Sequence, residues 1–174
     1  MRQDFSDFRD LLNCAIHKIL WLYFRTPIAG QDEEIFRERL FCYELYHQLR
    51  IVFDEKGFGY WLGGELDKSK HPLIRGDFKP DFVVHEPGFM DKNLCVLEVK
   101  PVTGAIAGFA KDITTLATFV TKYEYHAGIL LVFGDALLDA EAVRKKLGLD
   151  FNALRKLNVF VIWAQNAQSG VVEL

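Results

Sequence analysis

The 174-residue sequence has few of the residues that cross-link small proteins. It contains three cysteines, Cys14, Cys42 and Cys95, and no Cys-x-x-Cys pair. An odd number of widely spaced cysteines argues against a disulfide framework and against a cysteine zinc site. We therefore expect reduced thiols in the core of a chain that is long enough to fold without metal or disulfide cross-links.

The sequence also lacks an excess of positive charge. Its 21 lysines and arginines are outnumbered by 24 aspartates and glutamates, which gives a formal net charge of -3 at pH 7. Proteins that hold nucleic acid through their overall charge are basic. Any nucleic-acid partner must therefore be held by a local basic patch or by a bound metal ion.

The N-terminal apolar run does not have the form of a signal or a membrane anchor. His17 and Lys18 interrupt it, and a membrane helix needs about 20 consecutive apolar residues. Asp4, Asp7 and Asp10 precede the run, whereas a secretory signal begins with basic residues. These features predict a soluble, cytoplasmic protein that does not associate with membranes.

Length and composition fit one domain. Half of the residues, 50%, are hydrophobic, and the sequence shows no internal repeat, linker or low-complexity tract. We expect a single domain over residues 1–174, in which an N-terminal helical extension, residues 1–30, packs on a core formed by residues 31–165.

The spacing of apolar residues changes along the chain from a helical period to a strand period and back. Helices are predicted over residues 6–23, 33–53, 105–124, 139–148 and 151–157, and strands within residues 57–68, 77–86, 93–102, 126–134 and 158–165. This order predicts an α/β fold, with a mixed central sheet of about five strands flanked by helices on both faces.

Charged residues interrupt two of the predicted strands. If Asp81 faces Glu98 in the hairpin, the numbers of paired residues keep a constant sum, and Glu86 meets Asn93 beside the turn. Directly opposed side chains share a face of the sheet and lie about 5 Å apart. Lys100 follows Glu98 by two residues and shares the same face. The pattern therefore predicts that two carboxylates and an ammonium group converge.

Two carboxylates in such proximity repel each other unless a cation lies between them. Hard oxygen ligands suit Mg²⁺ or Mn²⁺, which also takes water molecules and substrate phosphate oxygens. An ammonium group beside the metal can orient a water molecule and offset charge on a pentavalent phosphate. The cluster therefore indicates a site that hydrolyses phosphodiesters.

Pro80-Asp81, followed after a hairpin by Glu98-Val99-Lys100, resembles the signature of the PD-(D/E)XK nuclease superfamily. Many restriction endonucleases and Holliday junction resolvases have this fold. The resemblance implies a restriction-endonuclease-like fold in which Asp81 and Glu98 bind Mg²⁺ or Mn²⁺. It further implies that the Val99 carbonyl is a metal ligand and that Lys100 positions the attacking water.

The order of elements supports the resemblance. The superfamily has an α-β-β-β-α-β core with the signature on its second and third strands, and the order predicted for residues 33–133 is similar. Members often add an acidic residue from the helix before the sheet. Glu44 is the candidate, acting on the metal directly or through water, because it lies at the rim of the apolar stripe of Phe41, Leu45 and Leu49.

The resemblance implies a metal-dependent nuclease, with DNA as the expected substrate and a defence or repair role. Two alternatives stay open: a catalytically silent nuclease-fold module that binds nucleic acid or a protein partner, and a hydrolase of small phosphoesters. The residues also have simpler interpretations. Asp81 fits a turn, Glu98 and Lys100 fit the solvated side of an edge strand, and Glu44 fits a solvated helix face.

Two further features are ambiguous. Glu65 and Asp67, at the end of the first predicted strand, fit either an additional metal ligand or a solvated turn. The aromatic segments at residues 21–24 and 58–61 suit a homodimer interface and a hydrophobic core equally well.

Overall fold

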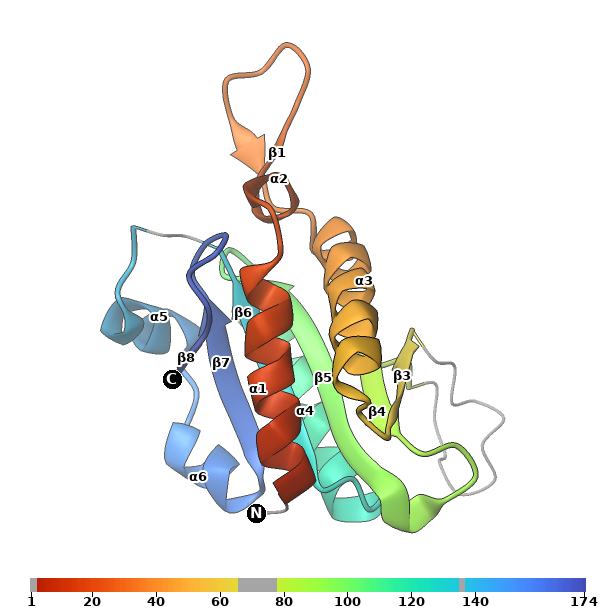
Figure 1. The fold of residues 1–174 in the computed structure, drawn as a ribbon. Helices are drawn as coiled ribbons and strands as arrows, with labels where there is room; N and C mark the ends of the chain where they lie inside the picture. Colours follow the sequence, from red (N-terminus) through yellow and green to blue (C-terminus); the bar gives the residue numbers. More distant parts are fainter. Residues whose placement is uncertain (1–2, 66–77, 135–136) are drawn as a thin grey trace.

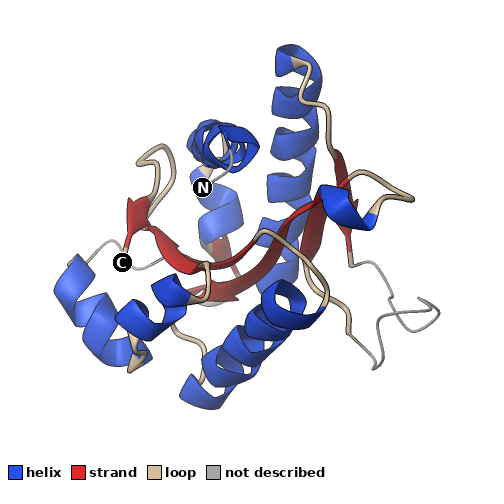
Figure 2. Cartoon of the chain, turned by 90° about the horizontal axis from the view of Figure 1, so that it is seen from below, coloured by secondary structure: helices blue, strands red, loops and turns tan. Residues whose placement is uncertain are grey.

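The computed structural model describes residues 3–65, 78–134 and 137–174. A central sheet separates two layers of helices (Figures 1 and 2). The helices are α1 (Gln3–His17), α2 (Trp21–Phe24), α3 (Glu38–Lys56), α4 (Ile106–Lys122), α5 (Ala140–Leu147) and α6 (Phe151–Lys156). No helix in the described part of the chain is long and apolar enough to span a membrane.

In the described part of the chain, the central sheet has six strands in the order β3-β4-β5-β6-β7-β8. They are β3 (Trp61–Gly64), β4 (Phe82–His85), β5 (Asn93–Pro101), β6 (Ala127–Phe133), β7 (Val159–Ala164) and β8 (Val172–Glu173). Strands β3, β4 and β5 are antiparallel, β5, β6 and β7 are parallel, and β8 is antiparallel to β7. The predicted α/β class and mixed sheet are confirmed. The sixth strand was not predicted, because two residues are too few to show an alternating pattern.

Each face of the sheet is covered by its own hydrophobic cluster. Helices α1 and α3 pack on one face, where Leu97, Val99 and Ile129 are buried. Helices α4, α5 and α6 pack on the other, where Val96 and Leu130 are buried. Because side chains alternate along a strand, Glu98 and Lys100 share the α4 face with Val96.

Two predicted helices have different bounds in the structure. The predicted first helix is divided into α1 and α2, and the helix predicted from residue 33 begins at Glu38. A small hairpin accounts for the second difference, because β2 (Glu34–Ile35) pairs with β1 (Thr26–Pro27). The hairpin projects beyond α2 at the top of Figure 1.

The register of the central hairpin is confirmed at one end and wrong at the other. Phe82 pairs with Leu97 and Val84 pairs with Cys95, which continues to Asp81 opposite Glu98. An irregularity after Val84 then places His85, instead of Glu86, opposite Asn93. A bulge of one residue explains the shift, since it adds a residue to one strand only.

Each of the two aromatic segments contains exposed and packed side chains, and the cysteines also differ in exposure. Trp21 and Trp61 are exposed, whereas Phe24 is buried and Phe58 and Tyr60 pack against the core on the α3 face. All three cysteines are free: Cys95 is buried, Cys42 is half-buried and Cys14 is exposed. The prediction of core thiols is thus wrong for Cys14.

Candidate metal and phosphodiester site

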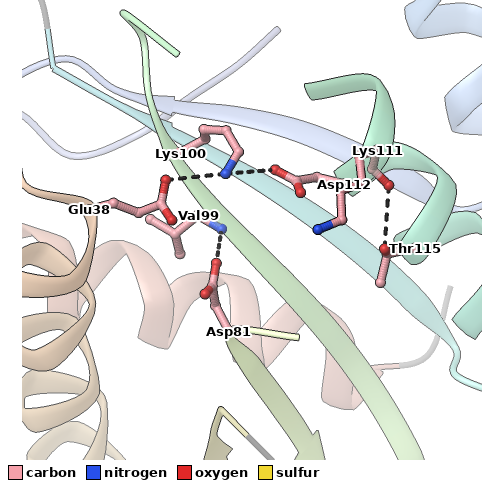
Figure 3. A network of polar contacts seen from close by, with 7 residues as sticks. All are labelled: Glu38, Asp81, Val99, Lys100, Lys111, Asp112 and Thr115. Carbon is pink, nitrogen blue, oxygen red and sulfur yellow. Dashed lines mark hydrogen bonds and ion pairs between the residues drawn. The ribbon is translucent and has the colours of Figure 1, made fainter. Parts of the chain in front are cut away.

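The candidate site lies where β4 begins beside the longer strand β5. Strand β5 continues to Pro101 and pairs with β6 over its whole second half, but β4 starts only at Phe82, opposite Leu97. Asp81 directly precedes β4, and its Oδ2 accepts a hydrogen bond of 2.7 Å from the Val99 backbone N–H (Figure 3). The Asp81 carboxylate therefore accepts the backbone hydrogen bond that a neighbouring strand would otherwise accept.

The structure places the Asp81 carboxyl group near that of Glu98. Glu98 is only 9% exposed, and Asp81 lies close enough for its charge to act on the Glu98 carboxyl group. Burial raises the pKa of Glu98, and the charges of Asp81 and Asp112 add to this effect. Burial likewise raises the pKa of Asp81, although the Val99 N–H opposes the shift. Burial and the neighbouring charges therefore favour the protonated form of Glu98, whereas a bound cation would favour its ionised form.

Lys100 lies beside this pair and is held by two carboxylates. Its Nζ lies 3.2 Å from Glu38 Oε2 on α3 and 3.2 Å from Asp112 Oδ2 on α4 (Figure 3). Burial acts to lower the pKa of Lys100, but the Asp112 and Glu38 carboxylates outweigh it and the pKa is raised. The ammonium group is thus charged at neutral pH and bridges two helices.

Two glycines accommodate the aliphatic part of Lys100. A Cβ atom on Gly104 would lie 3.1 Å from Lys100 Cγ, and one on Gly108 would lie 3.5 Å from Lys100 Cε. The first distance is too short for comfortable packing, and the second is an ordinary van der Waals contact. The absence of a side chain at Gly104 therefore lets the lysine lie against the start of α4.

Glu38 is the helix carboxylate that the structure brings to the site, and Glu44 is not brought there. The Glu44 carboxylate accepts a hydrogen bond of 2.7 Å from Gln48 on the same helix. At about 100° per residue, Glu38 and Glu44 lie on opposite sides of the buried Phe41. Sequence reasoning selected the wrong rim, because the apolar stripe alone does not show which rim faces the start of β4.

Asp112 was missed by sequence reasoning, although the sequence contains a signal for it. It is 7% exposed and lies in the buried stripe of α4 with Phe109, Leu116 and Phe119. Burial raises the pKa of its carboxyl group, against the effect of Lys100. An aspartate three residues after one core position and four before the next is the signal, since charges are rarely buried without a partner.

The second pair of acidic candidates is not brought into the cluster as side chains. Glu65 contributes its backbone N–H, which donates a hydrogen bond of 2.9 Å to the Asp81 carbonyl. Its exposed carboxylate lies 3.5 Å from Arg39 Nε. Asp67 lies outside the described residues.

The carboxylates of Asp81 and Glu98 suit a hard divalent cation that takes few of its ligands from the protein. Within residues 3–65, 78–134 and 137–174, no group of three or more His, Cys, Asp or Glu side chains is arranged to hold a metal ion. Mg²⁺, however, usually takes only one or two protein carboxylates and completes its shell with water and phosphate oxygens. The proximity of Asp81 and Glu98 fits this smaller set, because a cation between them would offset the repulsion of their charges.

The interpretation of Glu98 as part of the solvated face of an edge strand is wrong, because Glu98 is buried. Lys100 is only partly exposed and is paired with Glu38 and Asp112. A comparison of the sequence with protein-family models gave no match, and a search among curated proteins gave no match either. The functional assignment must therefore come from the geometry of the site.

Proposed function

We propose that this protein is a metal-dependent nuclease of the PD-(D/E)XK type, with DNA as its expected substrate. The observation that carries the proposal is the proximity of Asp81 to the buried Glu98, with the charged Lys100 following on the same strand. A buried carboxylate beside a second carboxylate is costly in a purely structural role. A site that binds a divalent cation gives this arrangement a function.

The order of elements supports a restriction-endonuclease-like fold. Helix α3 is followed by β3, β4 and β5, then by α4 and β6, which is the α-β-β-β-α-β order expected of that superfamily. The two parts of the signature lie at the start of β4 and on β5. This agreement extends from Glu38 to Phe133.

The residues have distinct roles in the proposed reaction. Asp81 and Glu98 would hold the cation. The Val99 carbonyl would assist them, because the N–H and C=O of a strand residue point to the same side. The bound Mg²⁺ or Mn²⁺ would supply Lewis-acid stabilisation of the phosphate and of the attacking water.

Lys100 would orient the attacking water and offset charge that develops on the phosphate. Glu38, and not the Glu44 that the sequence suggested for the metal, brings a helix carboxylate to the site, where it contacts Lys100. Asp112 holds the same ammonium group from the opposite helix. Both carboxylates therefore position Lys100 for its role.

Plasmid cleavage tests the proposal directly. Supercoiled plasmid should be nicked in Mg²⁺ or Mn²⁺, and Asp81→Ala should abolish nicking. Asp91→Ala serves as the matched control, since Asp91 is exposed in the β4–β5 turn. Binding of DNA without nicking in either metal would contradict catalysis and favour the silent nuclease-fold module. Hydrolysis of bis(p-nitrophenyl) phosphate without nicking would favour a hydrolase of small phosphoesters.

A further inference from the structure

Glu98 and Asp112 open onto a groove along α4. We name it the α4 groove. It has a volume of about 690 Å³, and its walls include Lys79, which directly precedes the Pro80-Asp81 signature, and Lys111, the neighbour of Asp112. The groove is therefore continuous with the proposed metal site, because Glu98 belongs to both.

Lysines line the outer part of the α4 groove, and carboxylates line its inner end. Lys79 and Lys111 are exposed, and neither forms an ion pair with another described residue. Lys100, in contrast, is engaged by carboxylates from both helices. The two outer lysines thus provide positive charge that is available to an anionic ligand, whereas the carboxylates lie at the inner end.

The wall formed by α4 is polar and extended. Lys111, Thr114 and Thr118 follow one another at intervals of three and four residues, which places them in one row along the helix. At 1.5 Å per residue this row is about 10 Å long, which exceeds the size of a single phosphate group. The Thr114 and Thr118 hydroxyls donate to backbone carbonyls one turn earlier, so their oxygens can accept hydrogen bonds from a ligand.

We propose that the α4 groove binds the sugar-phosphate backbone of the nucleic-acid strand that leads to Asp81 and Glu98. Lys79 and Lys111 contact phosphates that flank the reacting one, and the threonine row faces the sugars. The inference rests on the proposed function and narrows its substrate class to a polymer, because a small phosphoester would occupy only the inner end of the groove.

The test compares two double variants that each remove two exposed lysines. Lys79→Ala/Lys111→Ala alters the α4 groove, and Lys145→Ala/Lys146→Ala removes the same charge from α5. Fluorescence anisotropy with a labelled single-stranded oligonucleotide, in Ca²⁺ at several salt concentrations, measures binding. Hydrolysis of bis(p-nitrophenyl) phosphate in Mn²⁺ measures the chemistry of the inner site.

The groove variant should bind the oligonucleotide more weakly than wild type. The slope of log affinity against log salt, which is negative, should become shallower by about 1.4. Each lost single-strand phosphate contact removes about 0.7 from its magnitude. The α5 variant should keep the wild-type slope and should hydrolyse the small substrate at the wild-type rate. Equal slopes in the two variants, or no binding of the oligonucleotide by wild type, would overturn the proposal.

The same measurements separate this inference from the proposed function. If wild type hydrolyses neither substrate in Mg²⁺ or Mn²⁺, the nuclease assignment fails. The binding slopes still decide whether Lys79 and Lys111 contact phosphates. If wild type cleaves the oligonucleotide and the groove variant cleaves it with unchanged KM, the nuclease assignment stands and the α4 groove is excluded as the path of the strand.

Discussion

The ammonium group of Lys100 is fixed by residues that are distant in the sequence. Glu38 precedes it by 62 residues and approaches from α3, whereas Asp112 approaches from α4. Gly104 leaves room for the aliphatic stem. Because a pre-oriented charge needs no rearrangement during the reaction, this environment suits a residue that acts on the attacking water.

Replacement of Lys100 by methionine should separate metal binding from chemistry. Lys100→Met keeps much of the side-chain volume beside Gly104 but removes the charge, so Mn²⁺ binding measured by calorimetry should be retained. Single-turnover plasmid cleavage should slow by about 10²- to 10³-fold, the usual effect of losing one preorganised charge contact. Unchanged cleavage would show that Lys100 has only a structural role.

The variant Lys100→Met leaves Asp112 buried without its cation, which is destabilising. The double variant Lys100→Met/Asp112→Asn removes both charges and should recover thermal stability without recovering cleavage. Recovery of cleavage together with stability would indicate that the loss in Lys100→Met came from misfolding.

Glu38 and Glu44 form a matched pair on one helix. Glu38→Gln should lower the cleavage rate by about 10- to 100-fold, the range found for groups that orient a reactive site indirectly. Glu44→Gln should leave the rate unchanged, because the Glu44 carboxylate bonds to Gln48 on the opposite rim of α3. If Glu44→Gln slows cleavage and Glu38→Gln does not, then Glu44 is the helix carboxylate that acts in the site.

At the scale of secondary structure, the position of Asp112 depends on how closely α4 packs on β6. Gly128 lies on β6, where a Cβ atom would be 3.0 Å from the Cβ of Leu116. Leu116 is one helical turn from Asp112, so a displacement of the helix there also moves the carboxylate that holds Lys100. The packing of a glycine in the sheet and the chemistry of the site are linked through a single helix.

Gly128→Ala should therefore reduce both stability and activity. Overpacking of this kind costs about 1–3 kcal/mol, which urea denaturation can measure, and plasmid cleavage should slow in the folded variant. Gly59→Ala is the control, because a Cβ atom at Gly59 has no neighbour within 4 Å. Full stability of Gly128→Ala would show that α4 moves away from the sheet without cost.

At the scale of the whole molecule, the buried carboxyl groups link folding to pH and to metal. Burial raises the pKa values of Glu98, Asp81 and Asp112. Between the ordinary carboxyl pKa, about 4, and these raised values, the folded state binds more protons than the unfolded state. The free energy of unfolding consequently falls as pH rises through this range.

The Tm measured in EDTA should therefore fall from about pH 5 to about pH 8, and Glu98→Gln should flatten this decline by removing one titrating group. Mg²⁺ or Mn²⁺ should raise the Tm most at the alkaline end, where the cation no longer competes with a proton. A decline that is identical in Glu98→Gln, or a metal effect that is larger at acidic pH, would contradict the assignment of the proton and the cation to this pair.

The sequence alone determined the features that depend on local periodicity. Strand alternation has a period of two residues, so Glu98 and Lys100 had to share a face, and the hairpin pattern predicted Asp81 near Glu98. The order of helices and strands followed from the same change of period. These features need no knowledge of how the layers pack.

Only the tertiary structure decided which distant side chains complete the cluster. Glu38 and Glu44 are equivalent on the isolated helix, and the docking of α3 beside β4 distinguishes them. The partner of Asp112 likewise depends on the packing of α4 against β5 and β6. The two-residue strand β8 exists because β7 offers it an edge. Long-range docking is a property of the assembled layers, which a period along the chain does not encode.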